Sequence, residues 1–448
     1  MRKPYSAAII LIKQLLSFSI LLVFLSVQII IAPMATPIYG QEKIGDFKVP
    51  TEEGKPKFED TGLVSEVVVK GLVFPTTFAF LDKDKILVLE KDAGTVRMVN
   101  KGGIIAEPLL DVNVSSANER GMLGIAISKN ESKYPYVFLY YTESETADRE
   151  NVDKGNAPLG NRLYRYELVN DRLVNPKLLL DLPATPGPSH NGGAIRVGPD
   201  GNVYLTVGDV KGDRTHAQNA RGPAEADGRS GILRVTQDGH PVGEGILGDE
   251  HPLNFYYAYG IRNSFGMDFD PLTGNLWDTE VGNKEGDEIN LVEPGFNSGY
   301  SRVQGLAAAN ERFDTAELVD FNSSGRYSEP ELTWNYRMTP TAIQFLNSDK
   351  LGKQYENDLF LAGFNDGSLY HFDLNNDRGS LILNGVLADR VANSSEEMQQ
   401  IIFGQNFGAI TDLEVGPDGY LYVLSLSSGR EGGTIYKIMP SSDRISLQ

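Results

Sequence analysis

The sequence predicts an all-β fold made of six similar antiparallel sheets, and three observations support this prediction. The chain of 448 residues contains 47 glycines and 23 prolines spread along its length, as is typical of short strands joined by many turns. Helical spacing of apolar residues is confined to short segments such as 394–402. Between residues 78 and 438 one pattern recurs: a strand, a polar turn, a second strand, a glycine and a third strand.

The repeat is clearest in residues 193–207 and 411–424, where two strand-like runs flank the turn Gly-Pro-Asp-Gly. An apolar residue occupies the equivalent position in the first strand of every copy: Phe80, Ile127, Val197, Phe269, Phe345 and Val415. One small sheet cannot bury both of its faces, so neighbouring copies must stack, and radial stacking of four-stranded sheets produces a β-propeller. We therefore predict a six-bladed β-propeller of four-stranded antiparallel blades over residues 62–440. Residues 63–69 are expected to pair with the last blade and close the ring.

The N-terminal residues 1–40 have the pattern of a targeting segment. Three basic residues precede a mostly apolar run from Leu15 to Ile31, and small and turn-forming residues follow it up to Gly40. This pattern is typical of a secretory signal peptide, but the run is also long enough to serve as an N-terminal membrane anchor. Both alternatives predict that the domain lies outside the cytoplasm, either secreted or attached to the membrane by this segment. We expect residues 41–61 to form a linker and residues 441–448 to form a C-terminal tail.

The composition excludes several classes of function. The formal net charge of −19 opposes binding to nucleic acid phosphates, so no nucleic acid partner is expected. The chain contains no cysteine, which excludes disulfides, thiolate metal sites and cysteine nucleophiles.

Polar residues are concentrated in four segments that the repeat places on loops of different copies: 119–124, 189–193, 259–264 and 279–290. In a ring of sheets such loops point toward the central axis, so a histidine, arginines, an asparagine and carboxylates would face one cavity. His190 is the central candidate because it precedes a strand-like run and is followed by two glycines, which permit close backbone approach. A turn with an incidental histidine is the alternative interpretation of this segment.

These segments together resemble the glucose/sorbosone dehydrogenase family, soluble quinoproteins that include aldose sugar dehydrogenases. The matching motifs are Glu-Arg-Gly-Met-Leu-Gly at 119–124, His-Asn-Gly-Gly at 190–193, Tyr-Gly-Ile-Arg-Asn at 259–263, Leu-Trp with Glu280, and Gly-Asp-Glu-Ile-Asn at 286–290. Their order and spacing agree across residues 62–438. The resemblance implies a six-bladed propeller that oxidises an aldose sugar or related alcohol by hydride transfer to pyrroloquinoline quinone (PQQ), with electrons passing on to an unidentified external acceptor.

The resemblance also implies roles for individual residues. His190 matches the general base that removes the hydroxyl proton of the sugar, a task suited to a neutral imidazole. Arg262 and Asn263 match residues that contact the quinone oxygens, where the guanidinium of Arg262 would stabilise developing negative charge. Glu119 lies at the sugar-binding position.

Two further positions concern the metal and the cofactor plane. Gly282 and Asn283 match a pair of residues whose backbone carbonyls bind Ca²⁺, an ion that takes oxygen ligands. Trp334 matches an aromatic residue near the plane of the cofactor.

The sequence departs from the family where the carboxylates of PQQ are bound. Asn365 stands at a lysine position, and Ala409 and Thr411 stand at two arginine positions. Each missing charge-assisted contact is worth about 1.5–3 kcal/mol, so PQQ binding is expected to be weaker than in relatives with all three cations. Cations from other loops are candidates to replace them: Arg302, Arg312, Arg337 and Lys353.

Two alternative functions follow from this departure. A calcium-dependent lactonase or other hydrolase on the same propeller would need a metal but no cationic site for a tricarboxylate. A non-catalytic propeller could instead use the mouth of the channel to bind a glycan or a protein. Fold alone does not separate these alternatives from the dehydrogenase.

Overall fold

The computed structural model describes residues 55–128, 133–146, 158–307, 313–427 and 432–445. The expected targeting segment 1–40 and residues 41–54 of the expected linker lie outside the described residues. Within this part of the chain, no helix combines the length and the apolar character needed to cross a membrane.

The described strands pair into six sheets. The first sheet contains β3 (Pro75–Phe80), β4 (Lys85–Glu90), β5 (Thr95–Asn100), β6 (Gly103–Ile104) and β7 (Leu110–Asp111). The second sheet contains β8 (Met122–Ser128), β9 (Tyr136–Ser144), β10 (Pro158–Val169) and β11 (Arg172–Leu182). The third sheet contains β12 (Ile195–Val197), β13 (Val203–Val207), β14 (Gly231–Val235), β15 (Tyr256–Tyr259), β19 (Phe296–Asn297) and β20 (Arg326–Tyr327). The fourth sheet contains β16 (Gly266–Phe269), β17 (Leu276–Glu280), β18 (Asp287–Val292), β21 (Leu332–Trp334) and β25 (Val391–Ala392). The fifth sheet contains β22 (Pro340–Phe345), β23 (Leu359–Gly363), β24 (Leu369–Phe372), β26 (Ile402–Gln405) and β1 (Lys57–Phe58). The sixth sheet contains β27 (Ala409–Val415), β28 (Leu421–Leu426), β29 (Gly433–Pro440) and β2 (Leu63–Leu72).

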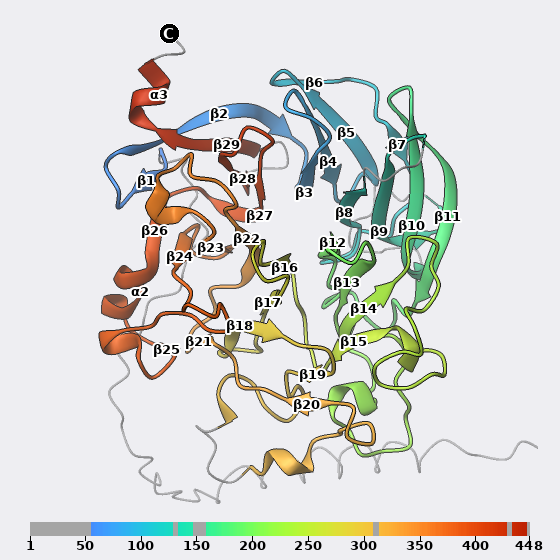
Figure 1. Ribbon diagram of the computed structural model, residues 1–448. Helices are drawn as coiled ribbons and strands as arrows, with labels where there is room; N and C mark the ends of the chain where they lie inside the picture. Colours follow the sequence, from blue (N-terminus) through green and yellow to red (C-terminus); the bar gives the residue numbers. More distant parts are fainter. Residues whose placement is uncertain (1–54, 129–132, 147–157, 308–312, 428–431, 446–448) are drawn as a thin grey trace, which may run out of the picture. The chain divides into compact units, whose positions relative to one another are not determined.

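These sheets give an all-β, propeller-like fold. The first strand of each sheet contacts the first strand of the next, in the order β3, β8, β12, β16, β22, β27 and back to β3. Figure 1 shows these six strands grouped around the middle of the view, with the later strands of each sheet farther out. The sheets are not uniformly four-stranded and antiparallel, because short outer strands such as β19, β20 and β25 join two of them in parallel pairings.

Apolar packing between successive sheets accounts for the stacking. A separate cluster of buried side chains fills each contact between neighbouring sheets around the ring, from Leu87 and Leu139 between the sheets of β3 and β8 to Val88 and Leu424 between the sheets of β27 and β3. Middle strands such as β13 are buried along their whole length because both faces of their sheet are covered. Burial of apolar surface on both faces is what the repeat in the sequence requires.

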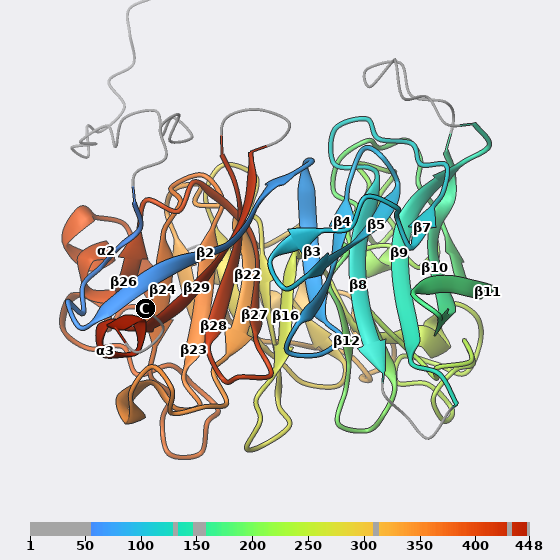
Figure 2. The same cartoon turned by 90° about the horizontal axis from the view of Figure 1, so that it is seen from above.

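Strands near the start of the described chain pair with strands near its end. β2 pairs antiparallel with β29 from Leu63 opposite Pro440 to Leu72 opposite Gly433, which confirms the expected pairing of residues 63–69 with the last copy of the repeat (Figure 2). At the described end of the expected linker, β1 pairs with β26 and Phe58 packs edge-on against Phe403. The start of the expected tail forms helix α3 (Ser441–Ile445), and its Asp443 accepts a hydrogen bond from Tyr420.

Few helices accompany the strands. The helical spacing at 394–402 corresponds to α2 (Ser395–Ile401), which begins at Ser394 with a capping box formed by Ser394 and Glu397. Single turns of 3₁₀ helix lie at His216–Gln218, Leu253–Phe255, Thr315–Glu317, Lys353–Tyr355 and Gly385–Leu387.

A charged cluster lies among the innermost strands. The guanidinium of Arg196 on β12 lies 3.5 Å from Asp268 on β16 and 3.1 Å from Glu414 on β27. Asp268 accepts a hydrogen bond of 2.8 Å from Gln344 on β22, and Asp412 on β27 accepts one of 3.0 Å from the backbone N–H of Phe78 on β3. Burial raises the pKa of Glu414 to about 8 and also raises the pKa values of Asp268 and Asp412. One arginine thus stabilises carboxylates contributed by two other sheets.

Replacing this arginine should destabilise the fold in a pH-dependent way. Arg196→Met leaves the carboxylates without their cation, so we expect a loss of about 3 kcal/mol in the free energy of unfolding at neutral pH. The carboxyl groups have raised pKa values in the folded state, so their unfavourable contribution grows as the pH rises from about 4.5 through 8. Urea unfolding should therefore show a larger loss at pH 8.5 than at pH 5.5.

Arg172→Met is the matched control, because Arg172 pairs with Glu107 on the surface with half of its side chain exposed, and its loss should be small. An equal loss for Arg196→Met at both pH values would contradict the assignment of the destabilisation to buried carboxylates.

Candidate functional site

A cavity of about 620 Å³ lies among loops of several sheets; we call it the mouth cavity. Six residues that the sequence marked as site residues line it: Glu119, His190, Arg262, Asn263, Gly282 and Asn283. A second cavity of about 460 Å³, the channel cavity, is lined by the innermost strands and by Arg196. The two cavities share Asn118, Glu119, Phe265, Arg337 and Thr339.

The loop before β12 sets the position of His190. His190 has a φ of 64°, and its backbone oxygen accepts a hydrogen bond of 3.0 Å from the N–H of Val210. Gly192 follows with a φ of +69°, and a Cβ atom there would lie 2.4 Å from the backbone oxygen of Thr206. Glycine is therefore required at 192 by both conformation and space, and the loop holds the imidazole against the next loop along the chain.

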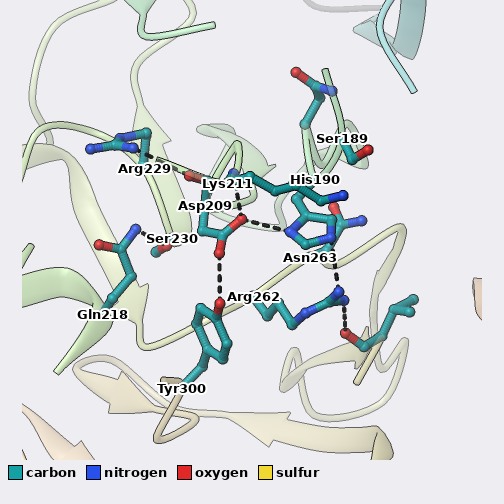
Figure 3. A network of polar contacts seen from close by, with 12 residues as sticks. Ser189, His190, Asp209, Lys211, Gln218, Arg229, Ser230, Arg262, Asn263 and Tyr300 are labelled. Atoms are coloured by element: carbon teal, nitrogen blue, oxygen red, sulfur yellow. Dashed lines mark hydrogen bonds and ion pairs between the residues drawn. The ribbon is translucent and has the colours of Figure 1, made fainter. Parts of the chain in front are cut away.

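The imidazole of His190 lies between the carboxylate of Asp209 and the guanidinium of Arg262. Its Nδ1 is 2.6 Å from Oδ1 of Asp209, and its Nε2 is 2.8 Å from Nη2 of Arg262 (Figure 3). A guanidinium can only donate hydrogen bonds, so Nε2 must accept with its lone pair and Nδ1 must carry the proton that is donated to Asp209. The contacts thus select a neutral imidazole whose basic nitrogen, Nε2, faces Arg262.

Asp209 is held by three donors. Its Oδ1 accepts from Nδ1 of His190 and from the backbone N–H of Lys211 at 2.8 Å, and its Oδ2 accepts from the hydroxyl of Tyr300 at 2.7 Å. Burial acts to raise the pKa of Asp209, but the hydrogen bonds from His190, Tyr300 and Lys211 outweigh burial and leave the pKa below its ordinary value. Asp209 therefore stays ionised and can stabilise a positive charge on His190.

Arg262 and Asn263 join the remaining loops to this histidine. The guanidinium of Arg262 donates to the backbone oxygen of Val281 at 2.7 Å. Asn263 accepts from the N–H of Gly192 at 3.1 Å and donates to Oε2 of Glu119 at 3.0 Å. The same oxygen of Glu119 accepts the N–H of His190 at 2.6 Å. Glu119 therefore connects two loops through one oxygen, and its expected contact with the sugar stays a prediction.

One buried carboxylate fixes two walls of the mouth cavity. Oδ1 of Asp287 accepts from the N–H of Gly282 at 2.8 Å, while Oδ2 accepts from the N–H groups of Met338 and Thr339 at 2.9 and 2.7 Å. Burial raises the pKa of Asp287 to about 6. The loop of Gly282 and the loop that carries Arg337 are thus held by the same side chain.

Other carboxylates lie behind the lining of the cavity. Burial raises the pKa of Glu280 to about 8, and Glu280 accepts the N–H of Arg262 at 2.6 Å. Glu288 is also buried, and its Oε1 accepts the N–H of Gly305 at 2.6 Å. These two glutamates stabilise loops and do not line either cavity.

Trp334 does not line the mouth cavity, and its expected place near the plane of the cofactor stays a prediction. Trp334 is fully buried on β21, packs among apolar side chains and meets the ring of Tyr370. β21 pairs with the third strand of its sheet, β18, so the indole lies between sheets and not in the mouth cavity.

The candidate replacement cations differ in whether they line the two cavities. Arg337 lines both cavities, whereas Arg302 pairs with Glu317 at 3.1 Å, and neither it nor Lys353 lines a cavity. Arg312 lies outside the described residues. At the three departing positions, Asn365 and Thr411 line the channel cavity and Ala409 is buried.

The lining of the mouth cavity also includes polar residues that the sequence motifs did not indicate, among them Asp209, Lys211, Arg214 and Tyr300. A signal for Asp209 exists, because Gly208-Asp209 directly follows the second strand of the copy that contains His190. Tyr300 follows β19, a later strand of the same sheet as β13, but it lies 91 residues along the chain from Asp209, and no local pattern links the two.

Comparisons with known proteins identify the family of this chain. The glucose/sorbosone dehydrogenase family matches residues 72–437. Aldose sugar dehydrogenase YliI of Escherichia coli K12 is 25% identical over 380 residues, which cover 84% of this chain and 92% of that protein. A putative oxidoreductase (glucose dehydrogenase) of Thermus thermophilus has a structure with a TM-score of 0.66 and 27% identity, covering 84% of this chain and 100% of that chain.

A further structure shows the same fold at lower identity. The PQQ-bound form of aldose sugar dehydrogenase from Streptomyces coelicolor is 21% identical, with a TM-score of 0.60, and the likeness covers 84% of this chain and 98% of that chain. Because the family match spans all six sheets, this chain belongs to the glucose/sorbosone dehydrogenase family.

Proposed function

We propose that this protein is a quinoprotein that oxidises an aldose sugar or a related alcohol by hydride transfer to PQQ, with His190 as the general base. We further propose that the six sheets are the blades of one six-bladed propeller, whose loops hold the site. The observation that carries the proposal is the position of His190 in the wall of the mouth cavity, where Nδ1 contacts Asp209 and Nε2 contacts Arg262.

The charges of the mouth cavity fit a polyanion such as PQQ, which has three carboxylates. Lys211, Arg214 and Arg337 line the cavity, and none of them forms an ion pair within the described part of the chain. The two acids of the lining, Glu119 and Asp209, already accept hydrogen bonds from the protein. The uncompensated charge of the cavity is therefore positive, although the whole chain has a net charge of −19.

The residues of this chain have defined tasks in the proposed reaction. Bound PQQ would supply the quinone that accepts the hydride, with Arg262 and Asn263 beside it. A sugar hydroxyl that replaces Arg262 at Nε2 of His190 would donate its proton to that nitrogen. Asp209 would stabilise the resulting imidazolium through Nδ1, and Tyr300 would hold Asp209 in place. The guanidinium of Arg262, still bonded to the oxygen of Val281, would face the developing negative charge.

We also propose a Ca²⁺ ion at Gly282 and Asn283. Both residues line the mouth cavity, and backbone oxygens are ligands that Ca²⁺ accepts. Asp287 supports this assignment because it fixes the N–H of Gly282 from behind and leaves the cavity side of the loop available.

The location of the protein outside the cytoplasm is part of the proposal. It rests on the basic residues and the apolar run in residues 1–40, acting as a signal peptide or an anchor. A fractionation experiment should find the domain in the extracytoplasmic or membrane fraction, and the intact chain free in the cytosol would contradict this.

A reconstitution assay tests the activity. The purified protein should reduce an artificial dye with at least one aldose when PQQ and Ca²⁺ are added, and it should not reduce the dye when PQQ is left out. Hydrolysis of a sugar lactone with Ca²⁺ alone is measured in parallel. Lactone hydrolysis without any sugar-dependent dye reduction would overturn the dehydrogenase in favour of the hydrolase.

Changing the base should lower turnover without unfolding the protein. His190→Asn keeps a residue that tolerates a positive φ but has no basic nitrogen, so kcat should fall by about 10²–10⁴. Asp209→Asn should also lower kcat, because a neutral amide stabilises the imidazolium less well than a carboxylate. His216→Asn is the control, since His216 pairs with Glu225 near the surface. Normal kcat in His190→Asn, with a lower melting temperature, would show a structural role instead.

A further inference from the structure

The cations of the mouth cavity are not equivalent. Lys211 and Arg214 come from the loop after β13, whereas Arg337 comes from the loop between β21 and β22. Among the described residues, Arg337 is the cation that lines both the mouth cavity and the channel cavity. It therefore lies at the boundary between the two and next to the uncharged Asn365, which lines the channel cavity, as Thr411 also does.

The backbone that carries Arg337 is fixed on two sides. Asp287 accepts the N–H groups of Met338 and Thr339, and the side chain of Asn365 donates to the backbone oxygen of Arg337 at 3.2 Å and to Oγ1 of Thr339 at 2.8 Å. The side chain of Arg337, in contrast, is exposed and makes no ion pair within the described part of the chain. The charge of Arg337 acts on Asp287, where burial raises the pKa and this charge opposes the rise, but it forms no ion pair there. A fixed backbone with such a guanidinium is suited to binding a carboxylate, which arginine contacts in a bidentate manner.

The amide of Asn365 positions the loop that carries the guanidinium of Arg337. This amide is used in two hydrogen bonds that hold the loop of Arg337, so position 365 positions the neighbouring loop instead of presenting a charge. Thr411 carries no charge, and Ala409 is buried. Lys91 and Arg196 also line the channel cavity, but Lys91 pairs with Asp92 and Arg196 pairs with carboxylates of other sheets. Among the described cations of the channel cavity, Arg337 is therefore the one that forms no ion pair.

We propose that Arg337 is the principal anchor for the carboxylates of PQQ, with Lys211 and Arg214 adding positive charge from the loop after β13. This inference rests on the proposed function, since it assumes that PQQ is the ligand of the mouth cavity. It differs from the sequence-based expectation of weak binding, because the cation lost from position 365 is replaced from an adjacent loop.

The test is equilibrium dialysis of PQQ against the purified protein with Ca²⁺, followed by the absorbance of PQQ, so that no turnover is needed. Arg337→Ala should raise the Kd by about 10- to 100-fold, the effect of one charge-assisted contact. Arg337→Lys keeps the charge and should lose less affinity than Arg337→Ala. The affinity of the parent protein should fall with added salt more steeply than that of Arg337→Ala.

Arg302→Ala is the matched control, because Arg302 lies outside both cavities and pairs with Glu317; its Kd should not change. Asn365→Lys in the Arg337→Ala background tests replacement of the charge, because residue 365 borders Arg337 and lines the channel cavity. This double variant should recover part of the lost affinity. Melting temperatures confirm that each variant is folded.

The outcomes separate the two proposals. If the parent protein binds no PQQ, the proposed function fails and this inference fails with it. If the parent binds PQQ and folded Arg337→Ala binds it equally well, only the role of Arg337 is overturned. No recovery in the folded double variant would overturn the replacement of one charge by the other.

Discussion

Every sheet in this protein is apolar on both faces, so every sheet must be covered by two neighbours. The six apolar clusters between successive sheets meet this requirement, and the contacts of the first strands return from β27 to β3. An open row of sheets would leave two apolar faces in water, at a cost of about 25 cal/mol for each Å² exposed. The pairing of β2 with β29 joins the start of the chain to its last sheet and supports the same closure.

Closure has a consequence for polar groups near the axis. First strands from all six sheets converge there, and their polar side chains must find partners among themselves. Some of these polar side chains form an ion cluster of Arg196, Asp268 and Glu414, which joins three sheets. At the mouth, where loops replace strands, the same convergence produces the contacts of His190 with Asp209 and Arg262. The chemistry of the site therefore depends on loops that are held by a rigid surrounding ring.

The carboxylates around the site divide into two groups by their surroundings. Asp209 receives three hydrogen bonds and remains ionised, so it can act on His190. Asp287 and Glu280 are buried with raised pKa values and bind backbone N–H groups, so they fix loops. Asp209 and Asp287 each accept three hydrogen bonds, so the difference comes from burial, which dominates for Asp287, and from the imidazole of His190 beside Asp209.

Local patterns in the sequence predict the repeat, the first strand of each sheet, the pairing of residues 63–69 and the loops that carry His190, Arg262 and Asn263. These features follow from local patterns: alternation in strands, glycine and proline in turns, and motifs on single loops. Only the tertiary structure decided that Trp334 is buried between sheets, that Tyr300 meets Asp209, and that Arg337 lies beside Asn365. The physical reason is that these contacts join distant segments or depend on side-chain direction, which ring closure and packing determine and a linear pattern does not contain.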